Sequence, residues 1–339
     1  MFMLKWAVAV RDAHPRGPPC GTESKARSAG LLLKFAILSM PLTTLPEPIL
    51  TLPDSMIPKF LRALFVLTTT VLIAPLIVLA GRAPLDPIAR DPYVSAIVID
   101  ADSGEPLFVK NALQPVYPAS VLKLMDLYVI LDQIQQGKLK LDDVVTTSAE
   151  ASNMGGSQVY LKEHEQFTVD ELLYALMIQS ANDAAVALAE HVAGSKEAFV
   201  AMMNSKAQEI GMKNSSFASV HGLPPAENQK VDVTTAKDMA TLCRALLKFP
   251  DTLKYTSTAE RGFRDSAFVM QTHNGLLKRV RGCDGFKTGY FKVAGYSIAA
   301  TAQRDARRVI AIVMGSESKQ TRDNQAAQLI ETGFQGLSH

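Results

Sequence analysis

Three short motifs in the chain combine residue types that could perform nucleophilic chemistry. The first is Ser120-Val-Leu-Lys123, in which the serine and the lysine would share one face of a helix. A serine hydroxyl is a poor nucleophile unless a neighbouring base removes its proton. A lysine can be that base when burial lowers its pKa, and Lys123 stands in a strongly apolar stretch. The pair therefore predicts an activated serine, with Ser120 as the nucleophile.

The other two motifs contain polar groups that could complete such a site. Ser180-Ala-Asn182 falls at a break between two predicted helices, where serine and asparagine also occur simply as helix caps. Lys287-Thr288-Gly289 falls at a strand edge, and its cation and hydroxyl could hold a carboxylate. A turn-rich strand end would contain the same residues. The glycine spacing before Lys287 excludes a phosphate-binding P-loop.

A second Ser-x-x-Lys sequence, Ser316-Glu-Ser-Lys319, shows that the pattern alone is not specific. This copy lies in a polar stretch between a predicted strand and a predicted helix, and we interpret it as a solvated loop. The apolar surroundings favour Ser120. The three motifs follow one another at spacings of 60 (180 − 120) and 107 (287 − 180) residues, an ordered set that chance does not readily produce.

The composition excludes several classes of protein. Of the 339 residues, 47% are hydrophobic and 20% are charged, which is typical of a folded chain. A formal charge of +2 does not suggest a nucleic-acid binder. Cys20, Cys243 and Cys283 form no Cys-x-x-Cys pair, which excludes zinc-ribbon and thioredoxin-type sites, although an oxidising compartment could pair the last two. Four of the six histidines are candidates for a metal site, but they show no metal-binding spacing, so we predict none; they are His164, His191, His221 and His273.

An uncharged apolar segment, residues 63–80, follows Lys59 and Arg62 and resembles a secretory signal peptide. A retained membrane anchor is the alternative, because about 18 apolar residues approach the length of a membrane span. Both interpretations predict an exported protein. Residues 1–55 could be an over-extended gene start, with Met56 as the natural start, or a disordered leader. We expect a signal or anchor at 56–80, a linker at 81–92 and one catalytic domain at 93–335.

The elements predicted within this domain place strands at both ends of a helical block. Strands are expected at 94–100 and 106–109, and an apolar, buried helix at 120–134. Thr168 and Glu171 form a capping box that begins the next helix. Further helices are expected at 183–192, 196–212 and 234–248, then strands at 285–289, 294–303 and 307–314, and a last helix at 320–333. Grouped strands around a helical insertion predict an α+β fold with an antiparallel sheet.

The ordered motifs resemble those of the penicillin-binding proteins and serine β-lactamases. Within that superfamily, the chain is similar to the D-alanyl-D-alanine carboxypeptidases of serine peptidase family S11 over about residues 93–334. The stretches YPASVLKLM, QSANDAAVALAEH and GFKTGYFKVAGYS carry this resemblance. It implies an antiparallel sheet flanked by helices, an inserted helical subdomain and no cofactor.

The resemblance also implies roles for the residues that move protons. Ser120 would attack the carbonyl between two D-alanines, and Lys123 would take its proton. Ser180 would relay a proton towards the leaving amine. Asn182 would orient the substrate and Lys123.

The binding roles follow from the same resemblance. Lys287 and Thr288, with Gly289 beside them, would bind the terminal carboxylate of the substrate. The backbone N–H groups of Ser120 and Tyr290 would form the oxyanion hole. Tyr290 and Phe291 depart from the polar residues often found after this motif, which leaves the substrate preference open.

The implied substrates are peptidoglycan stem peptides, with β-lactams as covalent inhibitors, in the periplasm or cell envelope. An N-terminal tether to the inner membrane stays open, and no C-terminal β domain is expected before His339. A DD-endopeptidase is the nearest alternative. A class A β-lactamase would need a Glu-x-x-Leu-Asn stretch between the second and third motifs, which the sequence lacks. A non-catalytic wall-binding protein would not need the intact serine and lysine residues.

Overall fold

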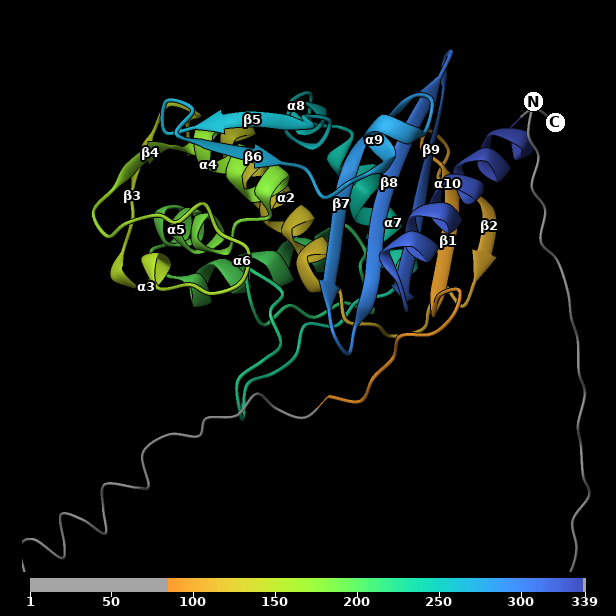
Figure 1. Cartoon of the computed structure of the whole chain (residues 1–339), viewed down its shortest axis with the longest axis horizontal. Coiled ribbons are helices and arrows are strands. Elements are labelled where there is room, and N and C mark those ends of the chain that lie inside the picture. The colour runs from red at the N-terminus through yellow and green to blue at the C-terminus, as the bar shows by residue number, and fades with distance from the viewer. Residues whose placement is uncertain (1–84, 338–339) are drawn as a thin grey trace, which may run out of the picture. The chain divides into compact units, whose positions relative to one another are not determined.

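The computed structural model describes residues 85–337, and a five-stranded antiparallel sheet forms one side of this region (Figure 1). The strand order is β2-β1-β9-β8-β7, which places the first strands of the region beside the last. The strands are β1 (Ser95–Asp100), β2 (Pro106–Lys110), β7 (Cys283–Phe291), β8 (Gly295–Arg304) and β9 (Arg307–Ser316). The predicted α+β fold is confirmed, as is the pairing of early and late strands across a long insertion.

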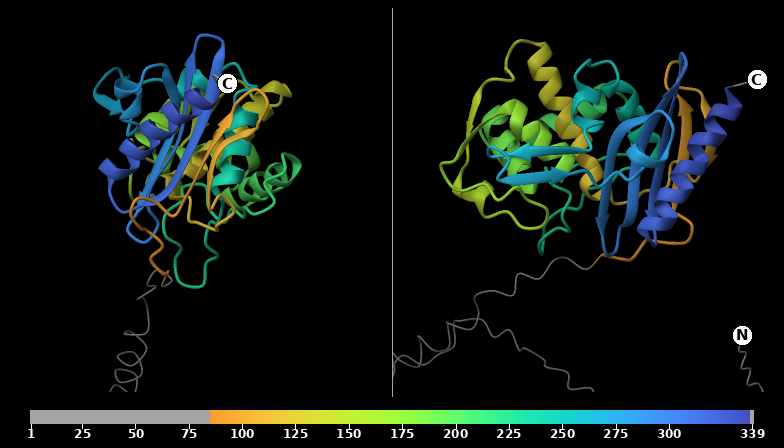
Figure 2. Two further views of the ribbon diagram at one scale, coloured as in Figure 1. Left: turned by 90° about the vertical axis from the view of Figure 1, so that its right-hand side faces the viewer. Right: turned by 45° about the horizontal axis from the view of Figure 1, so that its top comes forward.

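Strand β9 shows how the sheet separates two apolar cores. Its side chains alternate between the faces, as in any β-strand. Ile310, Ile312 and Met314 belong to the core shared with the helical insertion. Val309 and Val313 belong to a second core, which the last helix, α10 (Lys319–Gly336), covers from the other side (Figure 2). A strand buried on both faces reads as a continuous apolar run, as β9 does.

The helical insertion is built around α2 (Lys123–Gln135), which is buried from Lys123 to Leu131, as predicted for a helix that is apolar on all sides. A 3₁₀ turn, η2 (Ala119–Leu122), leads into it. The other helices are α3 (Ala149–Ser152), α4 (Val169–Tyr174), α5 (Asn182–Ala193), α6 (Lys196–Glu209), α7 (Ala236–Leu246), α8 (Thr252–Thr256) and α9 (Leu276–Arg279).

Several local expectations are confirmed and others need correction. The capping box of Thr168 and Glu171 is present, with both of its hydrogen bonds. The helix that it begins changes into a π-helical turn, η3 (Ala175–Gln179), which the periodicity did not predict. Two small two-stranded antiparallel sheets were also missed: β3 (Val144–Thr146) with β4 (Gln166–Thr168), and β5 (Glu260–Phe263) with β6 (Phe268–Gln271). These strands have three or four residues each, too few to establish a period-two pattern.

The remaining expectations concern cysteines and the N-terminal region. Cys243 and Cys283 are both free thiols, so the disulfide left open between them is not formed. No helix within residues 85–337 is long and apolar enough to cross a membrane. The segments 1–55 and 56–80, and Cys20, lie outside the described residues.

Candidate active site

The three motifs converge on one pocket of about 230 Å³ between the sheet edge and the helical insertion. Ser120 comes from η2, Ser180 from the break between η3 and α5, and Thr288, Gly289 and Tyr290 from the edge strand β7. Residues that lie far apart in the sequence therefore line a single recess. Lys123, Asn182 and Lys287 lie behind these residues, and hydrogen bonds connect them to the lining.

The Lys123 ammonium links the nucleophile to the second motif. Its Nζ donates to Ser120 Oγ at 3.2 Å, to Asn182 Oδ1 at 2.7 Å and to the His221 carbonyl oxygen at 2.7 Å. The Asn182 amide is itself fixed, because its Nδ2 donates to the Gly155 carbonyl oxygen at 2.7 Å. Three neutral acceptors therefore hold the lysine nitrogen within reach of the serine hydroxyl. This is the geometry that general-base activation requires.

Lys287 makes the corresponding link on the other side of the pocket. Its side chain is 2% exposed, and its Nζ donates to Ser180 Oγ and to the Thr288 carbonyl oxygen, both at 2.9 Å. Ser180 and Asn182 thus contact different lysines, Ser180 contacting Lys287 and Asn182 contacting Lys123. The second motif joins the serine–lysine pair to the third motif.

Local backbone geometry explains these positions. Ser180 ends the π-helical turn with φ 62°, in the left-handed region, which is sparsely populated for a residue that is not glycine. At Gly289, an added Cβ would lie 2.7 Å from the Pro118 carbonyl oxygen, so only glycine lets β7 pass this close to the turn that carries Ser120. At Gly222, a Cβ would lie 2.3 Å from the Ala119 carbonyl oxygen. Glycine therefore allows two segments to pack against the nucleophile turn.

Burial changes the titration of both lysines. Desolvation lowers the pKa of Lys123 to about 8, although the carboxylates of Asp126, Asp232 and Asp183 act in the opposite direction. Burial, and then the positive charges of Lys123 and Arg322, hold the pKa of Lys287 well below its ordinary value. A lysine that is partly neutral near pH 8 can accept a proton, which an exposed lysine does poorly at that pH.

The pocket contains residues that the motif search missed. They are Ser157, His273, Tyr296, Lys319 and Arg322. The Arg322 side chain is buried, and its Nε and Nη2 donate to Asp323 Oδ1 at 2.8 and 2.6 Å. Lys319 and Arg322 both lie near the N-terminus of α10, where the helix dipole disfavours cations. That unfavourable placement is the sequence signal that could have revealed them.

The interpretation of Ser316–Lys319 as a solvated loop is correct only for its middle, where Glu317 is exposed between β9 and α10. Ser316 is the buried last residue of β9, and Lys319 is the first residue of α10. Ser316 does not line the pocket, whereas Lys319 does. The copy therefore contributes a cation to the site, although its serine is buried in the sheet.

Aromatic rings form one wall of the pocket. Tyr290 and Tyr296 stack with ring centroids 4.0 Å apart, and Tyr290 is 51% exposed. Tyr117 and Phe291 stack nearby along the chain, with centroids 6.1 Å apart. Tyr290 and Phe291, the two residues that replace the polar residues often found after the third motif, thus both make ring contacts at the edge strand.

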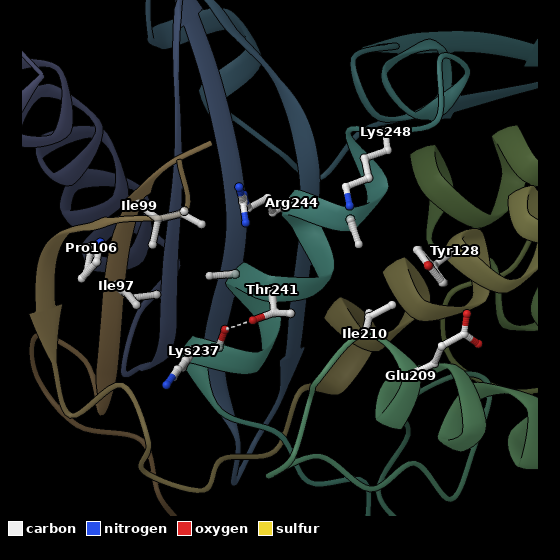
Figure 3. Close-up of a pocket in the computed structure, with 13 residues that line it drawn as sticks. Ile97, Ile99, Pro106, Tyr128, Glu209, Ile210, Lys237, Thr241, Arg244 and Lys248 are labelled. Atoms are coloured by element: carbon white, nitrogen blue, oxygen red, sulfur yellow. Dashed lines mark hydrogen bonds between the residues drawn. The ribbon is translucent and has the colours of Figure 1, made fainter. Parts of the chain in front are cut away.

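A larger recess lies elsewhere and contains none of the motif residues. It has a volume of about 500 Å³, and its wall follows α7, with Ile97 and Ile99 of β1 opposite (Figure 3). Its cations are Lys237, Arg244 and Lys248. As for metals, residues 85–337 contain no group of three or more histidine, cysteine, aspartate or glutamate side chains that could hold an ion.

The Ser120 hydroxyl is hydrogen-bonded to a buried lysine, and a second serine and lysine lie across the pocket of this α+β fold. This arrangement defines the class of serine–lysine acyl-transfer sites. Comparison with known families is specific: the model for D-alanyl-D-alanine carboxypeptidases, peptidase family S11, matches residues 91–318. The chain belongs to this family.

Individual relatives agree with the family match. The chain is 39% identical over 243 residues to the D-alanyl-D-alanine carboxypeptidase DacF of Bacillus subtilis, covering 71% of this chain and 61% of the relative. Penicillin-binding protein 6B of Escherichia coli has 33% identity and a TM-score of 0.67, covering 76% of this chain and 80% of that structure. Ampicillin-bound penicillin-binding protein D2 of Listeria monocytogenes has 30% identity and a TM-score of 0.65, covering 72% and 98%. The chain spans about three fifths of the length of the first curated relatives.

Proposed function

We propose that the protein is a serine D-Ala-D-Ala carboxypeptidase that removes the terminal D-alanine from peptidoglycan stem peptides. The observation that carries the proposal is the continuous set of contacts around one pocket, in which Lys123 joins Ser120 to Asn182 and Lys287 holds Ser180. Family membership and the carboxypeptidase names of the relatives support it.

The acylation step uses the first two motifs. Ser120 Oγ attacks the carbonyl carbon between the two D-alanines while its proton passes to neutral Lys123. The backbone N–H groups of Ser120 and Tyr290, two residues that line the pocket, would stabilise the oxyanion as it forms. The C–N bond then breaks, and the proton that Lys123 took from Ser120 passes by way of Ser180 to the leaving amine. Asn182 keeps Lys123 in place throughout.

The third motif and the newly found cations would bind the carboxylate of the terminal D-alanine. Thr288 offers a hydroxyl, and Lys287, Lys319 and Arg322 supply positive charge around the same recess. An entering carboxylate favours the charged form of Lys287, which burial otherwise disfavours. Substrate binding and the charge of Lys287 are therefore coupled. Water then hydrolyses the acyl-enzyme and releases the shortened peptide.

We further propose that the enzyme is exported and works in the cell envelope. The apolar segment 63–80, with basic residues before it, supports export, either as a cleaved signal or as a tether to the inner membrane. The same site would be acylated by β-lactams; the structures of the Listeria relative with ampicillin and cefotaxime support this.

Incubation of the enzyme with a pentapeptide that ends in D-Ala-D-Ala tests the proposal, with products identified by mass. We expect loss of one alanine from the peptide, and no product with Ser120→Ala. An intact pentapeptide together with cleavage of a cross-linked peptide dimer would instead identify an endopeptidase. If the wild type leaves both substrates intact, the proposed activity is wrong.

A further inference from the structure

Asp126 is a buried carboxyl group that the proposed reaction does not use. It lies on α2 one turn after Lys123, so the two side chains share a face of the helix. The residue is 2% exposed, and neither carboxyl oxygen has a hydrogen-bond partner in the structure. A buried polar group without a partner is costly and needs an explanation. The position of Asp126 on the same helix face as the proposed base supplies that explanation.

The two other carboxylates that act on Lys123 are already fully engaged. Asp183 accepts backbone N–H groups of Val159, Leu161 and Ala184. The carboxylate of Asp232 is held by the backbone N–H groups of residues 218 and 219 and by the Ser219 hydroxyl. These bonds give both groups structural roles. Asp126 has no such bonds, so the polar interaction that remains for it is the electrostatic one with Lys123.

Lys123, for its part, has only neutral acceptors. Its three hydrogen-bond partners are a hydroxyl, an amide oxygen and a backbone carbonyl oxygen. When Lys123 takes the proton of Ser120, it becomes an ammonium ion in a fully buried position, which is unfavourable without a nearby negative charge. Among the carboxylates acting on that charge, Asp126 is the largest contributor.

We propose that Asp126 is a positioning residue whose carboxylate stabilises the ammonium form of Lys123 and thereby sets the pH range in which Lys123 can act as a base. The inference rests on the proposed acylation chemistry. Burial raises the pKa of Asp126 well above its ordinary value, and the Lys123 ammonium acts in the opposite direction. The carboxylate in turn opposes deprotonation of Lys123, so the two groups titrate together.

The other charged groups around this pair fix the sign of the expected effect. Asp183 from α5 and Asp232 from the segment before α7 favour the ammonium form. Lys287 on β7 and His273 at the pocket also interact electrostatically with Lys123. These four groups stay in place when Asp126 alone is changed. Removal of its charge therefore lowers the pKa of Lys123, and the neutral base persists to lower pH.

The test is the pH profile of acylation by benzylpenicillin, measured by intact mass on the full chain. In Asp126→Asn we expect the midpoint to fall by about one pH unit, so that at low pH about ten times more of the plateau rate is retained. Asp126→Leu has nearly the same shape and needs no hydrogen bond. It should show the same shift with equal or greater thermal stability, because it removes an unsatisfied buried carboxyl group.

Asp132→Asn is the matched control, since Asp132 lies on the same helix but pairs with Lys206 at 3.0 Å. Its midpoint should equal that of the wild type. Unchanged midpoints in both Asp126 variants, or an equal shift in the control, would overturn the proposal. A wild type that is never acylated at Ser120 would instead contradict the proposed function, so the two failures are distinguishable.

Discussion

The motif pocket and the recess along α7 both have several cations around them, but these cations differ in burial and in hydrogen-bond partners. Behind the lining of the motif pocket, of about 230 Å³, Lys123 and Lys287 are buried and donate to the side chains of Ser120, Asn182 and Ser180. In the recess, of about 500 Å³, Lys237 and Lys248 are exposed at the rim (Figure 3). Arg244 donates there to the carbonyl oxygens of Ala101 and Asp102.

The comparison shows that the volume of a cavity does not determine whether its side chains can react. A solvated lysine keeps its charge and is a weak base, whereas a desolvated lysine loses part of its preference for the ammonium form. The larger recess therefore offers space and positive charge, but no nucleophile bonded to a base. The smaller pocket offers both, and the following predictions test whether this difference decides activity.

The largest effect should come from Ser120→Ala. It removes the nucleophile, so benzylpenicillin should leave no covalent adduct in intact-mass analysis, while the wild type gains one. Ser316→Ala is the matched control, because Ser316 begins the second Ser-x-x-Lys sequence and is buried outside the pocket. It should be acylated like the wild type. An adduct mapped to Ser316 would contradict our choice between the two copies.

Lys123→Arg should slow acylation by about 10²–10⁴-fold, the usual contribution of a positioned acid or base. Arginine keeps the positive charge but cannot lose its proton in the working pH range. Stopped-flow measurement of acylation provides the rate, and Lys248→Arg at the rim of the recess is the control with the same chemical change. Near wild-type rates in Lys123→Arg would mean that position 123 serves only as a charge.

The wild-type acylation rate should rise with pH through an apparent pKa of about 8, the value to which burial lowers the pKa of Lys123. Below this pKa Lys123 carries its proton and cannot accept another, so the rate should fall about tenfold for each pH unit. Above it the neutral amine predominates and the rate should level off. A midpoint near the ordinary lysine value of about 10.4 would show that burial does not tune this group.

Lys287→Ala should weaken turnover of D-Ala-D-Ala peptides with a free carboxylate by about 10–150-fold, equivalent to about 1.5–3 kcal/mol for a charge-assisted contact. A C-terminally amidated peptide cannot offer that charge and should lose much less. The comparison of kcat/KM for the two substrates isolates carboxylate binding from the contact of Lys287 with Ser180. Equal losses on both substrates would mean that Lys287 does not recognise the carboxylate.

Sequence patterns were sufficient for most of the fold and for the centre of the site. The apolar run of β9 and the all-round apolar surface of α2 predicted buried elements, because each apolar segment is long enough to form a recognisable pattern. The motifs identified Ser120 and Lys123 by type and order. The π-helical turn at 175–179 leaves the same apolar pattern as an α-helix, so the left-handed position of Ser180 was not visible beforehand.

The residues that sequence reasoning missed share a physical reason. Lys319 and Arg322 enter the pocket only because α10 packs against β9 and β8 and the sheet order places β8 next to β7, a long-range arrangement that no local pattern encodes. His273 and Tyr296 enter in the same way from separate segments. Local motifs identify the reacting groups, whereas the surrounding charge depends on how the sheet is ordered.

The smallest effect should come from the recess itself. Lys237→Ala and Lys248→Ala remove exposed side chains for which the structure shows no ion pair within residues 85–337. Each should change stability by no more than about 0.5 kcal/mol, as is usual for surface substitutions. Turnover of the pentapeptide should stay within about twofold of the wild type, because neither residue lines the motif pocket. Thermal melting and kcat/KM provide the two measurements. A tenfold loss of turnover with unchanged melting would mean that the recess contributes to the reaction, and desolvation of the lysines would then not explain which cavity is active.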